Sequence, residues 1–281
     1  MVTVHNINMR QKHGQNFLID NNIANNIVKA ADLEQQDKVL EIGSGKGILT
    51  KLIQPQVKHL TAVEIDETLS KQLNHFFSFH NVKNIEIINI DFLKFDLRDL
   101  QSSIITRDEA PQNTSFKIIS NLPYNIGTAI IQKILPLKNW TTAIFMLQKE
   151  VIQRLAAQPN SKDYGYISIF TSYYADCKVL FDVSPRCFNP PPKVVSSVVK
   201  LINKLPKLPE SIFFDFVKHS FSMRRKTILN CLSSFKELEK SQGTKILDSC
   251  GLDPFLRPDK LSISEFLRLT NKIKQYTICR I

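Results

Sequence analysis

The chain has 281 residues, which at roughly 100–200 residues per domain allows one large domain or one large and one small domain, and its 43% hydrophobic and 22% charged residues exclude wholesale disorder. No apolar run approaches the ~20 residues of a membrane span, and no secretory signal is expected. The five cysteines are widely spaced and form no CxxC pair, which argues against a disulfide framework and a zinc site. The net charge is +11, of which residues 200–281 carry +8. This uneven distribution indicates an anionic partner, and nucleic acid is favoured over a membrane surface. The alternative is that the basic surface is only solvated. We expect a cytoplasmic protein without a metal.

The first two thirds of the sequence alternate between strand-like and helical segments. Ile48–Ile53 and Leu69–Phe77 have the apolar spacing of helices, and they lie between short runs rich in Ile and Val. This alternation predicts an α/β fold in which helices cover both faces of a parallel sheet. The predicted strands of that sheet are Lys38–Ile42, Leu60–Ile65, Ile85–Ile90, Lys117–Ser120 and Thr142–Leu147. Three further runs predict antiparallel strands that close the sheet: Ile167–Tyr174, Lys178–Val183 and Ser197–Leu201.

The pattern changes after residues 203–210, a segment with two prolines that is predicted to be a linker. Beyond it, apolar residues such as Phe213, Phe216 and Val217 recur at helical spacing. A small α-helical domain that carries most of the positive charge is therefore expected at the C-terminal end. The predicted domains are residues 1–204 and 205–281.

A glycine-rich turn follows the first predicted strand of the sheet. Gly43, Gly45 and a third glycine form a GxGxG pattern, which differs from the GxGxxG of dinucleotide sites and from the phosphate loop. Glu64 ends the next strand, where a carboxylate can accept the hydrogens of ribose hydroxyls, and Asp91 follows the third strand in a position suited to an adenine amino group. Taken alone, the glycines could form an ordinary tight turn, Glu64 could be a solvated strand end, and Asp91 could cap a helix. Together they predict a nucleoside crevice, for a nicotinamide cofactor or for S-adenosylmethionine.

Asn121, Leu122, Pro123 and Tyr124 follow the fourth predicted strand at the same edge of the sheet. Because proline biases Leu122 towards an extended conformation, its carbonyl and the amide oxygen of Asn121 can form two convergent acceptors, with the ring of Tyr124 free to stack on a base. Two acceptors that hold the hydrogens of an exocyclic amine favour a tetrahedral nitrogen whose lone pair points at an electrophilic methyl group. This spacing indicates methyl transfer to a base amine; an ordinary proline-containing turn is the structural alternative.

A second proline-rich loop spans residues 184–196 and carries Phe188. We expect this ring to be exposed and to sandwich, with Tyr124, a base that is rotated out of its helix. Packing of Phe188 in the core is the alternative.

Five segments occur in the order found in ribosomal RNA adenine N6-dimethyltransferases, and the chain resembles this family over nearly its whole length. They are QNFLID, EIGSGKG, EID, NLPYNI and FNPPPKVVSS, at residues 15–20, 41–47, 64–66, 121–126 and 188–197. The resemblance implies a Rossmann-like methyltransferase domain, a helical C-terminal domain and S-adenosylmethionine as the methyl donor. By the same resemblance, Asn16 and Leu18 belong to the N-terminal cofactor motif, and the other cofactor-binding positions are Gly43, Glu64, Asp91 and Asn121.

The family has two branches whose substrates differ. The housekeeping branch (KsgA type) dimethylates two adjacent adenines near the 3′ end of 16S small-subunit rRNA, and the resistance branch (Erm type) modifies one adenine in large-subunit rRNA. The segments GQNFLID, FSMRRKTILN and RPDKLS, at residues 14–20, 221–230 and 257–262, resemble the former, although Val195 stands where that branch usually has Asp. The resemblance therefore implies two methyl transfers onto each of two adenines, with the small-subunit precursor as partner. Arg224, Arg225 and Lys226 suit phosphate contacts, or a solvated helix start.

Two alternatives to the housekeeping enzyme stay open. One is an enzyme of the resistance branch, which uses the same chemistry. The other is an RNA-binding assembly factor or transcription factor of methyltransferase descent, against which the intact NLPY and glycine-turn motifs argue. No heptad pattern indicates a dimer, so a monomer is expected.

Overall fold

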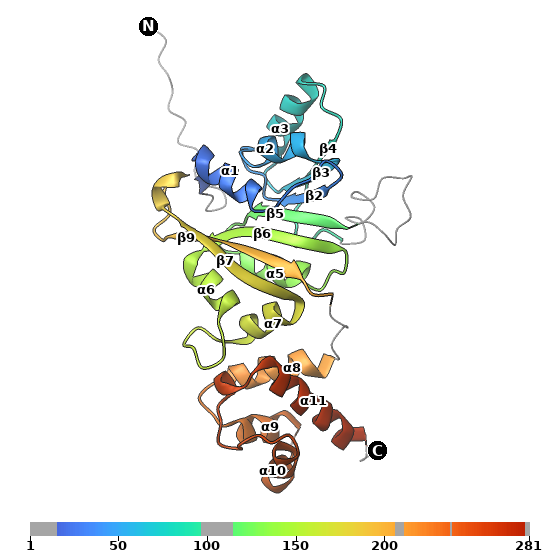
Figure 1. The fold of residues 1–281 in the computed structure, drawn as a ribbon, viewed down its shortest axis with the longest axis vertical. Coiled ribbons are helices and arrows are strands. Elements are labelled where there is room, and N and C mark those ends of the chain that lie inside the picture. Colours follow the sequence, from blue (N-terminus) through green and yellow to red (C-terminus); the bar gives the residue numbers. More distant parts are fainter. Residues whose placement is uncertain (1–15, 97–114, 206–210, 237, 279–281) are drawn as a thin grey trace. The chain divides into compact units, whose positions relative to one another are not determined.

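The computed structural model describes residues 16–96, 115–205, 211–236 and 238–278, and its centre is a seven-stranded sheet (Figure 1). The strand order is β4-β3-β2-β5-β6-β9-β7, and the pairs β4–β3, β3–β2, β2–β5 and β5–β6 are parallel. All five predicted parallel strands are confirmed, with ends that differ by at most two residues. Their bounds are β2 (Lys38–Ile42), β3 (His59–Glu64), β4 (Ile85–Asn89), β5 (Phe116–Asn121) and β6 (Trp140–Gln148). The predicted runs near residues 178–183 and 197–201 are β7 (Ala175–Val183) and β9 (Ser196–Asn203).

Short helices connect the parallel strands. A further helix, α1 (Asn21–Lys29), precedes β2 and begins where the Asp20 carboxylate accepts the backbone N–H groups of Asn22 and Ile23. Asp66 caps the helix after β3 in the same way, by accepting the N–H groups of Thr68 and Leu69. The helices that connect parallel strands are α2 (Thr50–Ile53) with the 3₁₀ turn η1 (Gln54–Gln56), α3 (Glu67–Phe79), which Asp66 caps, and α5 (Gly127–Ile134).

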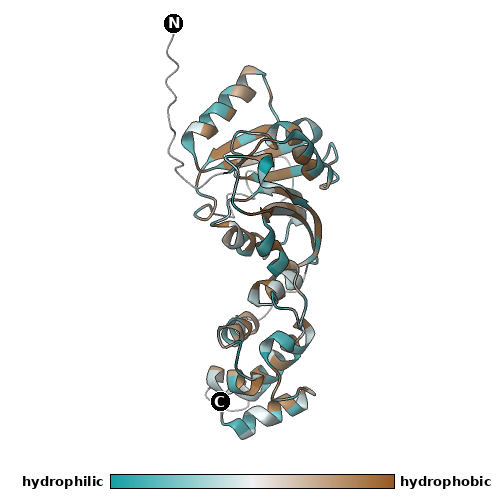
Figure 2. Cartoon of the chain, turned by 90° about the vertical axis from the view of Figure 1, so that its left-hand side faces the viewer, coloured by the Kyte–Doolittle hydropathy of each residue, from teal (hydrophilic) through white to brown (hydrophobic). Residues whose placement is uncertain are grey.

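Both faces of the sheet are buried at its central strands β2, β3, β5 and β6, as a parallel sheet requires. Val39 and Ile119 point to the face that also contains Ile27 of α1, and none of the three is measurably exposed. Their strand neighbours Leu40 and Ile118 point to the opposite face, since side chains alternate along a strand, and they are equally buried. In Figure 2 the strands are accordingly the most hydrophobic part of the sheet region. The expected covering of both faces is confirmed.

Two segments far apart in the sequence meet beside the carboxyl ends of the strands. The strand β1 (Phe17–Leu18) pairs antiparallel with β8 (Phe188–Asn189), which follows the 3₁₀ turn η3 (Pro185–Cys187). The N–H of Ile19 also donates to the carbonyl of Cys187, at 2.8 Å. The N-terminal segment is thereby held against the proline-rich loop.

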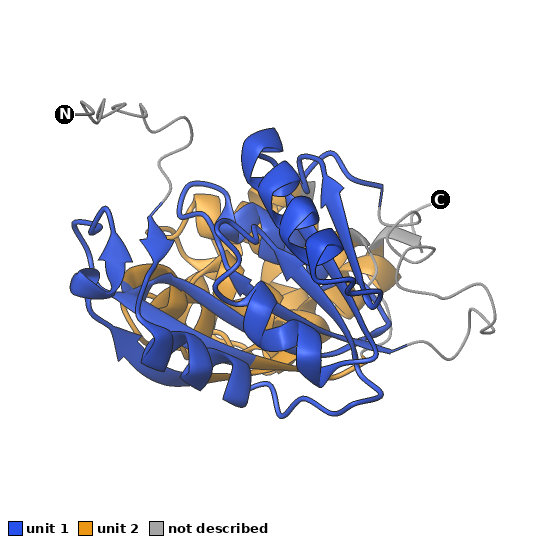
Figure 3. Cartoon of the chain, turned by 90° about the horizontal axis from the view of Figure 1, so that it is seen from above, with its two compact units in different colours: residues 1–149, 179–200 blue, residues 150–178, 201–281 orange. Residues whose placement is uncertain are grey.

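The contacts divide the chain into two compact units, coloured in Figure 3: residues 1–149 with 179–200, and residues 150–178 with 201–281. Residues 150–178 thus cluster with the C-terminal segment, whereas the sequence assigned them to the first domain. The domain boundary at residue 204 stays a prediction, and residues 206–210 of the predicted linker lie outside the described residues.

The second unit is helical, as expected. It contains α6 from residue 150 onward (Lys149–Ala156), α7 (Tyr166–Tyr174), α8 (Ser211–Ser222), α9 (Ile228–Lys236), α10 (Lys240–Ser249), the 3₁₀ turn η4 (Pro258–Lys260) and α11 (Ile263–Ile278). Phe213, Phe216, Leu232 and Phe266 are buried in its core, and the Tyr164 hydroxyl donates to the carbonyl of Leu261 at 3.0 Å. No helix among the described residues is long and apolar enough to cross a bilayer.

One predicted strand is wrong, because Ile167–Tyr174 lies within the helix α7. The run consists of β-branched, aromatic and small residues, which favour strands. Ser168, Ile169, Phe170 and Thr171 are all buried, so the helix shows no polar face that could have revealed a period of 3.6. Phe170 contacts Phe214 of α8, with ring centroids 5.0 Å apart, and this packing decides the helical conformation.

Gly47 is expected to be intolerant of a side chain. Its φ is +79°, and a Cβ would lie 2.4 Å from Cδ2 of the buried Leu73. Gly47→Ala should therefore lower the free energy of unfolding by about 1–2 kcal/mol for the left-handed backbone and a further ~1–3 kcal/mol for the clash. Gly251→Ala is the matched control, because Gly251 has a φ of +63° with no atom within 4 Å of the added Cβ. Denaturant unfolding in which both variants lose equal stability would contradict the contact with Leu73.

Candidate active site

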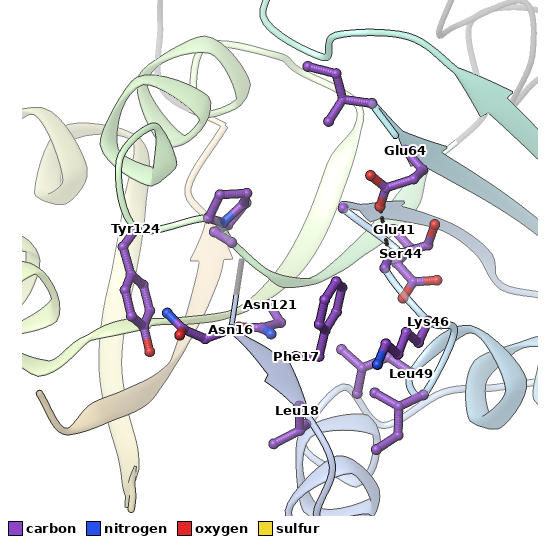
Figure 4. A pocket seen from close by; sticks show the side chains of 16 residues that line it. Asn16, Phe17, Leu18, Glu41, Ser44, Lys46, Leu49, Glu64, Asn121 and Tyr124 are labelled. Carbon is purple, nitrogen blue, oxygen red and sulfur yellow. Dashed lines mark hydrogen bonds between the residues drawn. The ribbon is translucent and has the colours of Figure 1, made fainter. Parts of the chain in front are cut away.

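A pocket opens at the carboxyl ends of β2, β3 and β5, where the sequence predicted a crevice (Figure 4). The N-terminal segment, the glycine turn, the end of β3 and the turn after β5 all line it. Glu64, Glu41 and Ser44 lie on one side in Figure 4, and Asn16, Asn121 and Tyr124 lie on the other. The lining residues are Asn16, Phe17, Leu18, Glu41, Gly43, Ser44, Gly45, Lys46, Ile48, Leu49, Glu64, Ile65, Asn121, Leu122, Pro123 and Tyr124.

The carboxylate of Glu64 is tied to the backbone at both oxygens. Its Oε2 accepts the N–H of Gly45 at 2.7 Å, and its Oε1 accepts the N–H of Asp66 at 2.9 Å. The side chain is only 2% exposed, so these two charge-assisted bonds compensate for its burial. Each oxygen keeps a lone pair, which is what two adjacent ribose hydroxyls would need.

Glu41, on β2, is the second carboxyl group in the pocket. Sequence reasoning did not single it out, and the available signal was its place at the start of the EIGSGKG segment. The side chain is 1% exposed, and its Oε2 has no hydrogen-bond partner. Burial raises the pKa of Glu41 to about 8, opposed by hydrogen bonding from Thr50, while the negative charge of Glu64 raises it further. The hydroxyl of Ser44, also in the lining, is likewise buried without a partner.

Phe17 is a lining residue that lies between the predicted Asn16 and Leu18. A Cβ on Gly45 would lie 3.3 Å from Cδ1 of its ring, and Lys46 Nζ lies 4.8 Å from its ring centroid. The glycine turn therefore leaves room for the Phe17 ring, which separates Asn121 from Lys46 in Figure 4. Sequence reasoning missed Phe17, and the only available signal was its place within the QNFLID segment.

The turn after β5 lies next to the glycine turn. A Cβ on Gly43 would approach Pro123 Cδ at 3.8 Å and the Asn121 carbonyl oxygen at 3.9 Å. The N–H of Leu122 continues the sheet by donating to the Met146 carbonyl at 3.1 Å, which fixes the start of the turn on β6. All four predicted residues of this turn, Asn121 to Tyr124, line the pocket.

Tyr124 is anchored by a residue that the sequence did not single out. Its hydroxyl lies 2.5 Å from Oγ of Ser196, the fully buried first residue of β9. Burial raises the pKa of Tyr124, so the hydroxyl is neutral and the bond is between two uncharged groups. The hydrogen bond holds the ring by its far end and fixes its direction.

Two predicted residues do not line the pocket. Asp91 lies beyond the end of β4, and its Oδ1 accepts the N–H of Leu93 at 2.9 Å. Phe188 is 3% exposed and packs in the core with Leu18, its partner in the β1–β8 pair. The expected exposure of Phe188 is therefore wrong, because the strand pairing turns its ring into the core. Cofactor binding by Asp91 and base stacking by Phe188 stay predictions.

The predicted basic cluster lies in the second unit, directly before α9. Arg225 and Lys226 are exposed, whereas the Arg224 guanidinium donates to the carbonyl of Lys162 at 2.7 Å. Only two of the three cations are thus entirely free for a phosphate. In the first unit, Val195 has an exposed side chain, and its carbonyl accepts the N–H of Lys149 at 3.0 Å, a bond that does not depend on the side chain.

The lining fits S-adenosylmethionine, the donor that the resemblance implies. Its ribose hydroxyls match the free lone pairs of Glu64, and its amino-acid end offers an ammonium and a carboxylate to the unpartnered Glu41 and Ser44 oxygens. Across the described ranges, no group of three or more His, Cys, Asp or Glu side chains could hold a metal ion.

Comparison with known proteins identifies the family of the chain. The family model described as ribosomal RNA adenine dimethylase matches residues 6–275. "Ribosomal RNA small subunit methyltransferase A" of Alkaliphilus oremlandii is 41% identical over 269 residues, which cover 92% of this chain and 90% of the relative. The protein of the same name from Clostridium botulinum is 36% identical over 92% of both chains.

Two solved structures share the fold. A dimethyladenosine transferase from Plasmodium falciparum superposes with a TM-score of 0.76 at 24% identity, covering 93% of this chain and 98% of that one. The 23S rRNA methyltransferase ErmE superposes with a TM-score of 0.66 at 26% identity, covering 92% and 100%. The expected Rossmann-like α/β fold with a helical C-terminal part is confirmed.

The Tyr124–Ser196 hydrogen bond can be tested by a double-mutant cycle. Ser196→Ala and Tyr124→Phe should each lower the free energy of unfolding by about 1 kcal/mol, and the double variant should lose little more than either single variant. In the control cycle, Ser197→Ala replaces Ser196→Ala, because the neighbouring Ser197 hydroxyl bonds Asp182 instead. Additive losses in the first cycle would show that the two hydroxyls do not interact.

Proposed function

Because the chain belongs to the ribosomal RNA adenine dimethylase family, we propose that it dimethylates N6 of two adjacent adenosines near the 3′ end of 16S rRNA in the small ribosomal subunit. It is an S-adenosylmethionine-dependent methyltransferase. The small-subunit relatives at 36–41% identity support the housekeeping substrate.

A single observation carries the proposal. One pocket contains both the glycine turn with Glu64 and the turn from Asn121 to Tyr124. Cofactor-binding and base-binding groups are therefore adjacent, as a direct transfer between the two ligands requires. The groups proposed to hold the cofactor are Asn16, Leu18, Gly43, Gly45, Glu64, Asp91 and Asn121.

The side chains and backbone of the turn act on the target amine by position. The Asn121 amide oxygen and the Leu122 carbonyl accept the two N6 hydrogens, and this orients the nitrogen lone pair. Bound S-adenosylmethionine supplies an electrophilic methyl group. No strong base is needed before attack, because the methylated amine loses its proton afterwards, so preorganised neutral acceptors are sufficient. Tyr124, held by Ser196, provides a ring face for the base, and Pro123 keeps the turn rigid.

The second unit is proposed to bind the substrate particle. Arg225 and Lys226 are exposed beside Arg224, and this unit includes most of the residues between 200 and 281 that carry a charge of +8. Phosphate contacts of this kind position an RNA without reading its sequence. We infer that the protein works where small subunits are assembled, in the cytoplasm, and that it acts as a monomer.

The substrate can be tested by offering labelled S-adenosylmethionine with two acceptors side by side. One is an unmethylated small ribosomal subunit, and the other is protein-free large-subunit rRNA. Label recovered as N6,N6-dimethyladenosine from the small subunit is the expected result. Label in the large-subunit RNA would assign the protein to the resistance branch, and cofactor binding without transfer would indicate an RNA-binding factor.

Asn121→Ala should lower kcat by about 10²-fold, because it removes an acceptor that acts in the transition state. Affinity for the small subunit should change little, since the phosphate contacts lie elsewhere. Single-turnover methylation together with subunit binding separates the two quantities. Asn25→Ala on α1 is the control, because this exposed side chain bonds only the Asn21 carbonyl within its own helix. Equal losses of binding and turnover in Asn121→Ala would contradict the assigned role.

A further inference from the structure

The two carboxyl groups of the pocket differ in the hydrogen-bond donors that their oxygens receive. Glu64 receives a backbone N–H at each oxygen, at 2.7 and 2.9 Å, and its charge is compensated. Glu41 Oε2 has no donor at all, although its side chain is 1% exposed. Hydrogen bonding from Thr50 only partly opposes the effect of burial on Glu41. An ionised carboxylate with an unsatisfied buried oxygen is disfavoured, so Glu41 favours either a proton or a cationic ligand.

Among the described residues that line the pocket, none places a cation on Glu41. The titratable groups that share its pocket are Glu64 from β3, Lys46 from the glycine turn and Tyr124 from the turn after β5. Glu64 repels a second negative charge, and Tyr124 is neutral because burial raises its pKa. Lys46 is exposed, and its ammonium lies over the ring of Phe17. Before a ligand binds, the carboxyl group is therefore protonated at neutral pH, consistent with its pKa of about 8.

The neighbouring unpartnered hydroxyl indicates which part of a ligand belongs here. Ser44 Oγ is buried in the same lining and can donate to a carboxylate. A carboxyl acceptor and a hydroxyl donor side by side match an α-amino acid group, with its ammonium towards Glu41 and its carboxylate towards Ser44. The ribose hydroxyls, being neutral, would not supply the positive charge that an ionised Glu41 requires.

We propose that Glu41 carries a proton before the cofactor binds and releases it to solvent when the ammonium of the cofactor's amino-acid end takes its place. The proposal rests on the proposed function only in that it takes the cofactor to be S-adenosylmethionine. The protons balance as follows: the neutral Glu41 carboxyl group loses one proton to the buffer, and the resulting carboxylate pairs with the ammonium of the ligand. Cofactor binding is thereby coupled to pH, and Glu41 selects ligands that possess the cationic end.

The sign of the coupling follows from proton linkage. A ligand that binds the deprotonated form binds more tightly as pH rises towards the pKa of Glu41. Between pH 5.5 and 7 the Glu41 carboxyl group is protonated before binding, and the ligand's amino group, whose pKa is about 8, already carries its proton. Binding then releases one proton from Glu41, so the affinity for the ligand should rise by up to about tenfold per pH unit.

Calorimetric titration with S-adenosylhomocysteine, in two buffers of different ionisation enthalpy at pH 6.5, measures the protons released. We expect about one per ligand for the wild type and none for Glu41→Gln, whose amide mimics the protonated carboxyl group. 5′-Methylthioadenosine shares the nucleoside and the sulfur but lacks the amino acid, so it should release none. Glu86→Gln is the matched control, because Glu86 on β4 also has a pKa raised by burial but lies outside the pocket lining. This variant should behave as the wild type.

The outcomes separate the two proposals. Proton release that persists in Glu41→Gln, or tight binding by the wild type without release, would overturn the role of Glu41 and leave the methyltransferase intact. Equal release with 5′-methylthioadenosine would overturn the assignment of the ammonium. Failure of S-adenosylhomocysteine to bind the wild type at all would count against both this inference and the proposed function.

Discussion

The bond between the Gly45 N–H and the Glu64 carboxylate, at 2.7 Å, is the constraint on which the site depends. It joins the turn after β2 to the end of β3, and the bond from Asp66 fixes the same carboxylate from the other side. Parallel pairing of the two strands determines that both ends arrive at one edge of the sheet. The glycine turn is therefore held at a fixed distance from a buried negative charge, and the space in front of it is the pocket.

The second half of the site is built by contacts between remote segments. Pairing of β1 with β8 brings the N-terminal segment to the pocket, where Phe17 packs against the glycine turn. β9 contributes Ser196, whose hydroxyl holds Tyr124. These contacts leave the Asn121 to Tyr124 turn with little freedom, which suits a reaction in which neutral acceptors act by position rather than by proton transfer. Glu41 adds to this site a carboxyl group whose pKa is raised to about 8 by burial.

The sequence by itself determined the sheet, the glycine turn, the acidic residue at the end of β3 and the NLPY turn. Each of these is local, because strand periodicity, glycine spacing and a proline turn are specified by neighbouring residues. Parallel pairing then brings the strand ends together without further information. The resemblance carried by these motifs gave the chemistry, and the relatives at 36–41% identity agree with it.

Only the tertiary structure decided what depends on burial and on distant contacts. Residues 167–174 form a helix because Phe170 and its neighbours are buried on several sides, which removed the period that the sequence would have shown. Phe188 is in the core because β8 pairs with β1. Glu41 begins the EIGSGKG segment, but only the structure shows that its Oε2 is buried without a hydrogen-bond partner. Desolvation and long-range hydrogen bonds are properties of the packed chain, so no local pattern can encode them.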